Sequence, residues 1–119
     1  MTITDEEAHR QATQYAYRVT WSAEDKQYLS TCIEFPSLSV LEDNPASTIL
    51  NIMALVRGVL VNMSISGETP PEPLSAMKYS GQLRLRLPPA LHRRLAIQAA
   101  EQKISLNRLI INKLTDTGD

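Results

Sequence analysis

Large aromatic side chains are scarce in this sequence: Phe, Trp and Tyr together make up 5% of its 119 residues. A chain of this length can hold one or two small domains, which excludes a large enzyme. Because few large side chains are available, each domain can bury only a small core of its own. We therefore expect part of the core to be shared with a second copy or with another protein.

Cysteine and targeting signals are scarce as well. The single cysteine, Cys32, cannot form an intramolecular disulfide or a multi-thiolate zinc site, and its alternating apolar neighbours are typical of a small core residue. The acidic N-terminus lacks the apolar segment of a secretory signal, and no apolar run reaches the roughly 18 residues that a membrane helix needs. The sequence therefore predicts a cytoplasmic protein that is not bound to a membrane.

Motifs for catalysis are also missing. The sequence has no glycine-rich phosphate loop, no paired-histidine metal motif and no context for a serine or cysteine nucleophile. Turn formation and the charge at a helix start explain the adjacent carboxylates at 24–25 and 42–43 better than a metal site does. We expect no enzymatic activity, no catalytic or metal-binding residues, and no cofactor.

The net charge of −1 hides a strong asymmetry along the chain. Residues 1–77 carry four basic and ten acidic side chains, a net charge of −6, whereas residues 78–119 carry eight basic and three acidic ones, a net charge of +5. This division indicates a basic module for a polyanion and an acidic module for another partner. Two differently solvated faces would give the same division, so both interpretations are open.

The N-terminal half shows the alternation of a β-hairpin. Residues 1–15 are predicted to be a polar tail or a loosely attached helix. Apolar and polar residues then alternate over 17–21 and 27–35, with turn-forming residues between them. Pro36 is expected to interrupt the pairing, and residues 38–41 to form a short third strand. Four aromatic residues are expected in the core of this sheet: Tyr17, Trp21, Tyr28 and Phe35.

A long helix is predicted over residues 45–65. Asn44 is a suitable N-cap and Pro45 a suitable first residue, and apolar side chains follow at three- and four-residue spacing. These side chains cover more than the usual third of the circumference, which favours a covering layer beyond the sheet. Three prolines within four residues then stop regular structure. We therefore predict a domain over residues 16–66 and a linker over residues 67–79.

The sharpest pattern lies in residues 82–88, which read Gln-Leu-Arg-Leu-Arg-Leu-Pro. Strict alternation places three leucines on one face of a strand and Gln82, Arg84 and Arg86 on the other. A lone strand cannot persist, because its backbone groups need partners. No other strand is predicted nearby, so the natural partner is the same strand of a second chain.

Two helices are predicted after this strand, and residues 115–119 are predicted to be a tail. Pro88 and Pro89 open the first helix, and Ser105 is a suitable N-cap for the second. The apolar side of the first helix is formed by Leu91, Leu95, Ala96 and Ala99, with Arg93, Arg94, Gln98 and Glu101 pointing outward. The apolar stripe of the second is formed by Leu106, Leu109, Ile110 and Leu114.

The order strand, helix, helix over residues 80–114 resembles the ribbon-helix-helix DNA-binding domain of the Arc and MetJ type. In that family, the strands of two chains pair into a ribbon that enters the major groove. The resemblance implies that the polar strand face reads bases, through Gln82, Arg84 and Arg86, which suit such contacts chemically. It also implies a phosphate at the start of the second helix, at Ser105, Leu106 and Asn107. Two interpretations are open for Arg93, Arg94 and Arg108: they attract DNA phosphates, or they are ordinary solvent-exposed charges.

The order of features from Tyr17 to Leu114 resembles the HicB family of antitoxins. The features are the Tyr17–Trp21 strand, the Ser-Ala-Glu-Asp turn, Phe35-Pro36, the helix from Pro45, the proline-rich linker, Leu87-Pro-Pro-Ala-Leu-His92 and Ser105-Leu-Asn107. The resemblance implies an α+β fold: a small β-β-β-α domain similar to a partial RNase H fold, followed by a dimerising ribbon-helix-helix domain. It implies two partners, a HicA-like RNA-cleaving toxin masked by the N-terminal domain and the operator DNA of the chain's own operon. The toxin-binding residues are not predicted.

Alternatives stay open beside this interpretation. A ribbon-helix-helix regulator could sense a small molecule through its N-terminal domain and have no toxin partner. A residual nuclease would cleave RNA or DNA with a metal. The homodimer formed through residues 82–88 could pair further into a tetramer through the helix at 45–65. The sequence also departs from the family at residues 41–45, where the turn before the helix has no glycine.

Overall fold

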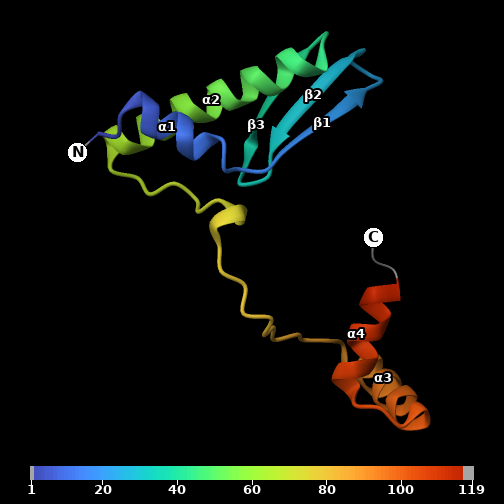
Figure 1. The fold of residues 1–119 in the computed structure, drawn as a ribbon. Helices are drawn as coiled ribbons and strands as arrows, with labels where there is room; N and C mark the ends of the chain where they lie inside the picture. The colour runs from blue at the N-terminus through green and yellow to red at the C-terminus, as the bar shows by residue number, and fades with distance from the viewer. Residues whose placement is uncertain (1, 117–119) are drawn as a thin grey trace. The chain divides into compact units, whose positions relative to one another are not determined.

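The computed structural model describes residues 2–116, and its elements form an α+β fold (Figure 1). The chain divides into two compact units between Tyr79 and Ser80. The first unit contains a three-stranded antiparallel sheet and the helices α1 (Asp5–Ala12) and α2 (Pro45–Ser66), and the second contains α3 (Pro89–Gln102) and α4 (Leu106–Asp116). The predicted fold class and the small β-β-β-α arrangement are confirmed. Residues 117–119 of the predicted tail lie outside the described residues.

The sheet has the order β1 (Tyr17–Ser22), β2 (Gln27–Cys32), β3 (Phe35–Glu42). The predicted hairpin turn is confirmed, and the Ser22 hydroxyl donates to the Asp25 carboxylate at 2.8 Å. Pro36 interrupts the regular pairing as predicted, because the register of β2 with β3 shifts between Thr31, opposite Ser39, and Cys32, opposite Phe35. The strand bounds differ from the prediction, since β2 ends at Cys32 and β3 already begins at Phe35. As β3 is an edge strand, a proline there need not remove a sheet hydrogen bond.

The helix α2 begins and ends as its sequence predicts. The Asn44 side chain accepts hydrogen bonds from the N–H groups of Ala46 at 2.7 Å and Ser47 at 3.3 Å, and Gly67 ends the helix with a φ of 80°. Asn44 itself has a φ of −129°, and Lys26 and Lys103 are the non-glycine residues with positive φ among those described. The turn before α2 therefore needs no glycine.

One side of α2 packs on the sheet through Thr48, Ile52, Val56 and Leu60, which are all buried. The Ser30 hydroxyl donates to the Thr48 carbonyl at 2.9 Å, and the Thr48 hydroxyl donates to the Val40 carbonyl at 3.0 Å. The polar groups inside this layer are therefore satisfied. By length and composition α2 is also able to cross a membrane, contrary to the expectation that no apolar run is long enough.

Of the two alternatives predicted for residues 1–15, the structure shows the helix, and it is packed on the first unit rather than loosely attached. The helix α1 is capped by the Thr4 hydroxyl, which accepts from the Glu7 N–H at 3.1 Å. Its Ala8 and Ala12 are buried in the core with Tyr15, and the Ile3 N–H donates to the Ser64 hydroxyl at 2.8 Å. Two alanines four residues apart let a mostly polar helix lie close to α2, a contact that hydrophobic periodicity does not reveal.

The predicted linker 67–79 is corrected in part, because its proline-rich segment is bound to the first unit. The Tyr15 hydroxyl donates to the Pro71 carbonyl at 2.7 Å, the Ser75 hydroxyl donates to the Gln14 carbonyl at 2.7 Å, and Pro73 is buried. The Glu34 carboxylate accepts from the Leu74 N–H at 2.9 Å and from the Ala16 N–H at 3.0 Å. We call these contacts of residues 71–75 the linker clasp.

We expect the Glu34→Gln variant to weaken the linker clasp and to lower the free energy of unfolding by about 1 kcal/mol at neutral pH. Burial raises the pKa of Glu34, but hydrogen bonds from the Leu74 and Ala16 N–H groups outweigh it, so the net pKa is lowered. The carboxylate's contribution is thus complete above its unfolded-state pKa of about 4.3 and is lost as the pH falls through the folded-state value.

Urea unfolding of both proteins from neutral to acidic pH checks this expectation. The stability difference between wild type and Glu34→Gln should shrink at acidic pH. A difference that stays constant over the whole range would show that the charge of Glu34 is not what holds the clasp.

Candidate nucleic-acid interface

The two helices of the second unit are joined by a short, well-defined turn. Lys103 adopts a left-handed conformation with a φ of 58°, its N–H donates to the Ala100 carbonyl at 3.2 Å, and the Ile104 N–H donates to the Ala99 carbonyl at 3.1 Å. The Ser105 hydroxyl then accepts from the Arg108 N–H at 3.0 Å, which confirms Ser105 as the cap of α4.

The core between α3 and α4 is very small. Ala99 and Leu109 are the buried apolar residues among those described in this unit, and Leu91, Leu95, Leu106 and Ile110 are half-buried. Ala96 and Leu114, predicted on the apolar sides of the helices, are exposed in the single chain, and Gln98, predicted to point outward, is half-buried. One chain alone does not supply the side chains that would cover these positions.

Residues 82–88 form no regular secondary structure within the single chain. Leu83 is 86% exposed and Leu85 is 54% exposed, so the apolar side of the predicted strand is uncovered. A strand needs backbone partners that the neighbouring helices cannot offer. Pairing with the same segment of a second chain therefore stays a prediction. The uncovered leucines support it, because a second chain would bury them.

The predicted base-reading side chains, Gln82, Arg84 and Arg86, are all exposed. The Gln82 N–H donates to the Ser80 hydroxyl at 3.0 Å, which holds the start of the segment. Neither arginine forms an ion pair within the described part of the chain. Their guanidinium groups are thus available for an external acceptor.

The start of α4 has the geometry of an anion site. Ser105 and Asn107 are exposed and Leu106 is half-buried. As first residues of a helix, Leu106 and Asn107 have N–H groups without an acceptor in the preceding turn, and the helix dipole adds positive potential there. The three residues offer groups that suit a phosphate, and phosphate binding there stays a prediction.

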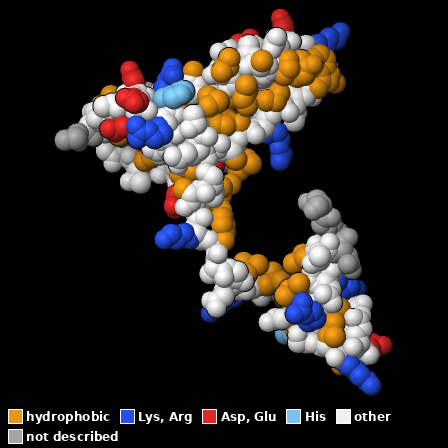
Figure 2. Space-filling view, in the orientation of Figure 1, with side chains coloured by type: hydrophobic (Ala, Val, Ile, Leu, Met, Phe, Trp, Pro, Cys, Tyr) orange, Lys and Arg blue, Asp and Glu red, His pale blue; other side chains and the backbone are white. Residues whose placement is uncertain are grey.

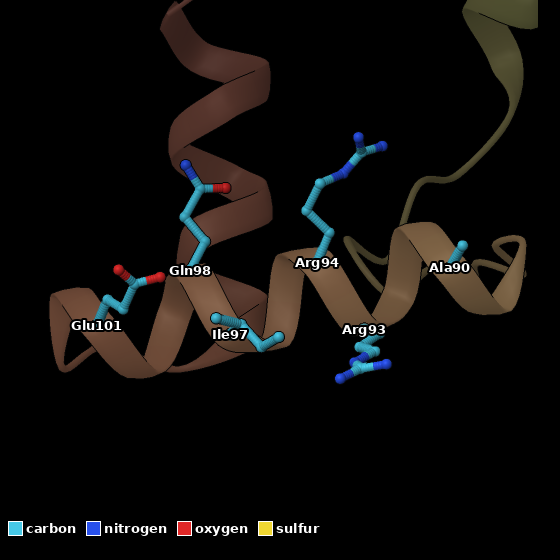
Figure 3. Close-up of a pocket in the computed structure, with 6 residues that line it drawn as sticks. All are labelled: Ala90, Arg93, Arg94, Ile97, Gln98 and Glu101. Carbon is cyan, nitrogen blue, oxygen red and sulfur yellow. The ribbon is translucent and has the colours of Figure 1, made fainter.

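An open hollow of about 500 Å³ runs along α3 (Figure 3). It is lined by Ala90, Arg93, Arg94, Ile97, Gln98 and Glu101. The side chains of Arg93 and Arg94 point to different sides of the helix in Figure 3. The hollow therefore does not gather charged groups around one ligand, and it is a helix surface rather than an enclosed site.

The first unit holds no comparable cluster of reactive groups. Cys32 is buried as predicted, and burial raises the pKa of its thiol, which keeps it protonated. Among the described residues, no three His, Cys, Asp or Glu side chains are grouped to hold a metal ion. Trp21 is the exception to the predicted aromatic core, because it is 56% exposed. Strand alternation alone does not reveal this exposure.

A model of the HicB family matches residues 64–114 of the chain. The match runs from the end of α2 through the proline-rich segment to α4, and the sheet lies outside it. The matched residues make up less than half of the 119, so the match shows a similarity of this part of the chain to the HicB family. The comparisons with curated proteins and with solved structures gave no match.

We expect the Lys103→Gly variant to stabilise the second unit by up to about 1 kcal/mol, because glycine adopts the left-handed conformation without the steric cost that a side chain brings. Lys103→Ala removes the same charge but keeps the strained backbone, so it is the matched control and should not stabilise. Urea unfolding at fixed protein concentration measures both. Equal stability of the two variants would show that the conformation of Lys103 carries no cost.

Proposed function

We propose that this chain is a HicB-type antitoxin that represses its own operon and masks a HicA-like RNA-cleaving toxin. The observation that carries the proposal is the family match over residues 64–114, which includes the exposed alternating segment 82–88 and both helices behind it. The proposal places the protein in the cytoplasm, where both operator DNA and the toxin's RNA are found.

The DNA-binding half of the proposal rests on the exposed polar side chains of residues 82–88. Two chains pair these residues into an antiparallel ribbon, which covers the exposed leucines and presents Gln82, Arg84 and Arg86 of each chain to the major groove. Arginine can contact guanine and glutamine can contact adenine through two hydrogen bonds, each good pair giving about 1–3 kcal/mol of discrimination. The start of α4 at Ser105, Leu106 and Asn107 binds a backbone phosphate.

The toxin-binding half of the proposal rests on charge. Residues 1–79 carry five basic and ten acidic side chains, a net charge of −5, whereas residues 80–119 carry a net charge of +4. A toxin that grips RNA needs a basic surface, which an acidic protein complements. The acidic unit is therefore the one that we assign to the toxin.

The double variant Arg84→Ala with Arg86→Ala removes four guanidinium groups from the proposed dimer. We expect it to lose operator binding by a hundredfold or more, since each good base contact gives about 1–3 kcal/mol, while toxin binding is unchanged. Fluorescence anisotropy with a fragment of the chain's own promoter measures the first, and titration calorimetry with the toxin measures the second. Loss of both activities together would contradict the assignment of one function to each unit.

The double variant Arg93→Ala with Arg94→Ala removes the same charge from α3 and is the matched control. It should weaken binding to operator and random DNA by the same factor and make binding less salt-dependent, since phosphate contacts carry no sequence information. A selective loss of operator binding in this control would move the reading surface from residues 82–88 to α3.

The partner is tested by affinity capture of the full chain from its native host, followed by mass spectrometry. We expect a small basic protein that cleaves RNA once it is released from the chain. Recovery of the chain alone, with its promoter binding intact, would overturn the toxin-masking function and favour a regulator that senses a small molecule. A change of operator affinity on adding a metabolite would then support that second function.

A further inference from the structure

An aromatic pair lies at one end of the sheet, formed by the exposed Trp21 and the half-buried Tyr28. Trp21 of β1 is opposite Tyr28 of β2, which is opposite Glu42 of β3. Strand alternation places this row on the same face as Ser30, which is 0% exposed beneath α2. Trp21 is nevertheless 56% exposed, although it lies on the side of the sheet that carries the helix.

The tryptophan is held in place by its neighbour. The rings of Trp21 and Tyr28 meet edge to face, with their centroids 5.1 Å apart and an angle of 70° between their planes. Such a pair is ordered before any partner arrives, so binding costs less side-chain entropy than it would for a free side chain. Exposed, preordered tryptophan and tyrosine are the residue types that dominate binding energy at protein interfaces.

The covering helices stop short of this row. α2 packs mainly on β2 and β3, and α1 lies beside the C-terminal half of α2, where Ile3 is bonded to Ser64 (Figure 1). Within the described part of the first unit, no second helix lies beside the N-terminal half of α2 (Figure 1). One flank of α2 is therefore covered by α1 over its later turns and is open over its first turns.

The open flank of α2 is apolar and faces the aromatic pair. The Asn51 side chain donates a hydrogen bond to Glu42, so its side of the helix faces β3. Ile49 and Met53 lie two residues to either side of Asn51, about 200° around the helix, and therefore face the opposite way, toward β1. Both are half-buried. Leu50 lies two residues from both Thr48 and Ile52, which face the sheet, so it points away from the sheet at the outer margin of this flank, and it is 67% exposed. Figure 2 shows hydrophobic side chains gathered over α2 and the adjoining end of the sheet.

Acidic side chains surround this end of the unit. The hairpin turn carries Glu24 and Asp25, both exposed, and the end of β3 is followed by Asp43, whose carboxylate accepts from the Gln27 amide at 3.0 Å. Lys26 in the same turn and Arg57 on α2 are the nearby basic residues. An apolar centre with a charged rim is the usual anatomy of a protein interface, and the net acidity selects a basic partner.

We propose that Trp21, Tyr28, Ile49, Leu50 and Met53, with Glu24 and Asp25 at the rim, form the surface on which the first unit binds a basic protein. We call it the Trp21 surface. The inference rests on the proposed toxin-masking function and names the surface that performs it. The basic toxin places an apolar side chain against Trp21 and positive side chains opposite the acidic turn.

The test uses the full chain and the small basic protein recovered in the capture experiment. Trp21→Ala should weaken their complex by about thirtyfold or more, as expected for an interface tryptophan, and Leu50→Ala by about tenfold. Ile65→Ala is the matched control, because Ile65 lies on the same helix with 66% exposure against 67% for Leu50, but outside the surface. This control should change the affinity by less than about twofold.

The charged rim is tested in the same assay by two matched double variants. Glu24→Lys with Asp25→Lys should slow association about tenfold at low salt, and the difference should fade at high salt. Glu68→Lys with Glu72→Lys changes the net charge by the same amount away from the surface. If both double variants slow association equally, the overall charge of the unit attracts the partner and the acidic turn does not.

Trp21 is the only tryptophan of the chain, so it also reports binding without a mutation. Incorporation of 5-fluorotryptophan gives one fluorine resonance, which should shift and become shielded from a soluble quencher or relaxation agent when the basic protein binds. This measurement shows whether the basic protein covers Trp21 even if the Trp21→Ala variant folds poorly.

The outcomes separate the two proposals. A recovered partner that binds Trp21→Ala and Leu50→Ala as tightly as wild type, with an unshifted fluorine resonance, overturns the Trp21 surface but leaves toxin masking intact. The absence of any basic partner overturns both. If the chain alone shifts the resonance with rising concentration, and Trp21→Ala halves its mass in sedimentation, the surface binds a second copy and not a toxin.

Discussion

Burial of one side of α2 is the interaction on which the first unit depends. Ile52, Val56 and Leu60 are almost completely buried, and Val56 and Leu60 belong to one core cluster with the small side chains of α1. Because a helix this apolar has more hydrophobic surface than the sheet and one short helix can cover, part of it stays open. The exposed Leu50 and the uncovered Trp21 follow from the same shortage of covering elements.

The second unit faces the same constraint more severely. With only Ala99 and Leu109 buried among its described apolar residues, α3 and α4 hide too little surface to be stable on their own. A second chain would add a second strand and a second pair of helices. The exposed leucines at 83 and 85 could then be buried in a core that the two chains share. Dimerisation would then supply folding energy and the DNA-reading surface in one step.

Local signals allowed the sequence to predict the elements but not their tertiary contacts. Alternation, proline and the caps at Asn44 and Ser105 placed three strands and three helices close to their observed bounds. The docking of α1 and the linker clasp escaped prediction, because two alanines and the Glu34 carboxylate act on segments distant in sequence. The exposure of Trp21 depends on which strands α2 covers. The candidate DNA-contacting residues come from the resemblance to the ribbon-helix-helix family, and the structure adds that Gln82, Arg84 and Arg86 are exposed.

The two uncovered surfaces carry opposite charges, which in the proposed function assigns them to different partners. The apolar side chains at Trp21 and Leu50 are accompanied by the carboxylates of Glu24 and Asp25, which repel a phosphate backbone. The leucines at 83 and 85 alternate with the guanidinium groups of Arg84 and Arg86, which repel a basic protein. Apolar contact alone would let either surface accept either partner. Under the proposed function, the opposite charges would provide the specificity with which one short chain binds DNA with one unit and a basic protein with the other.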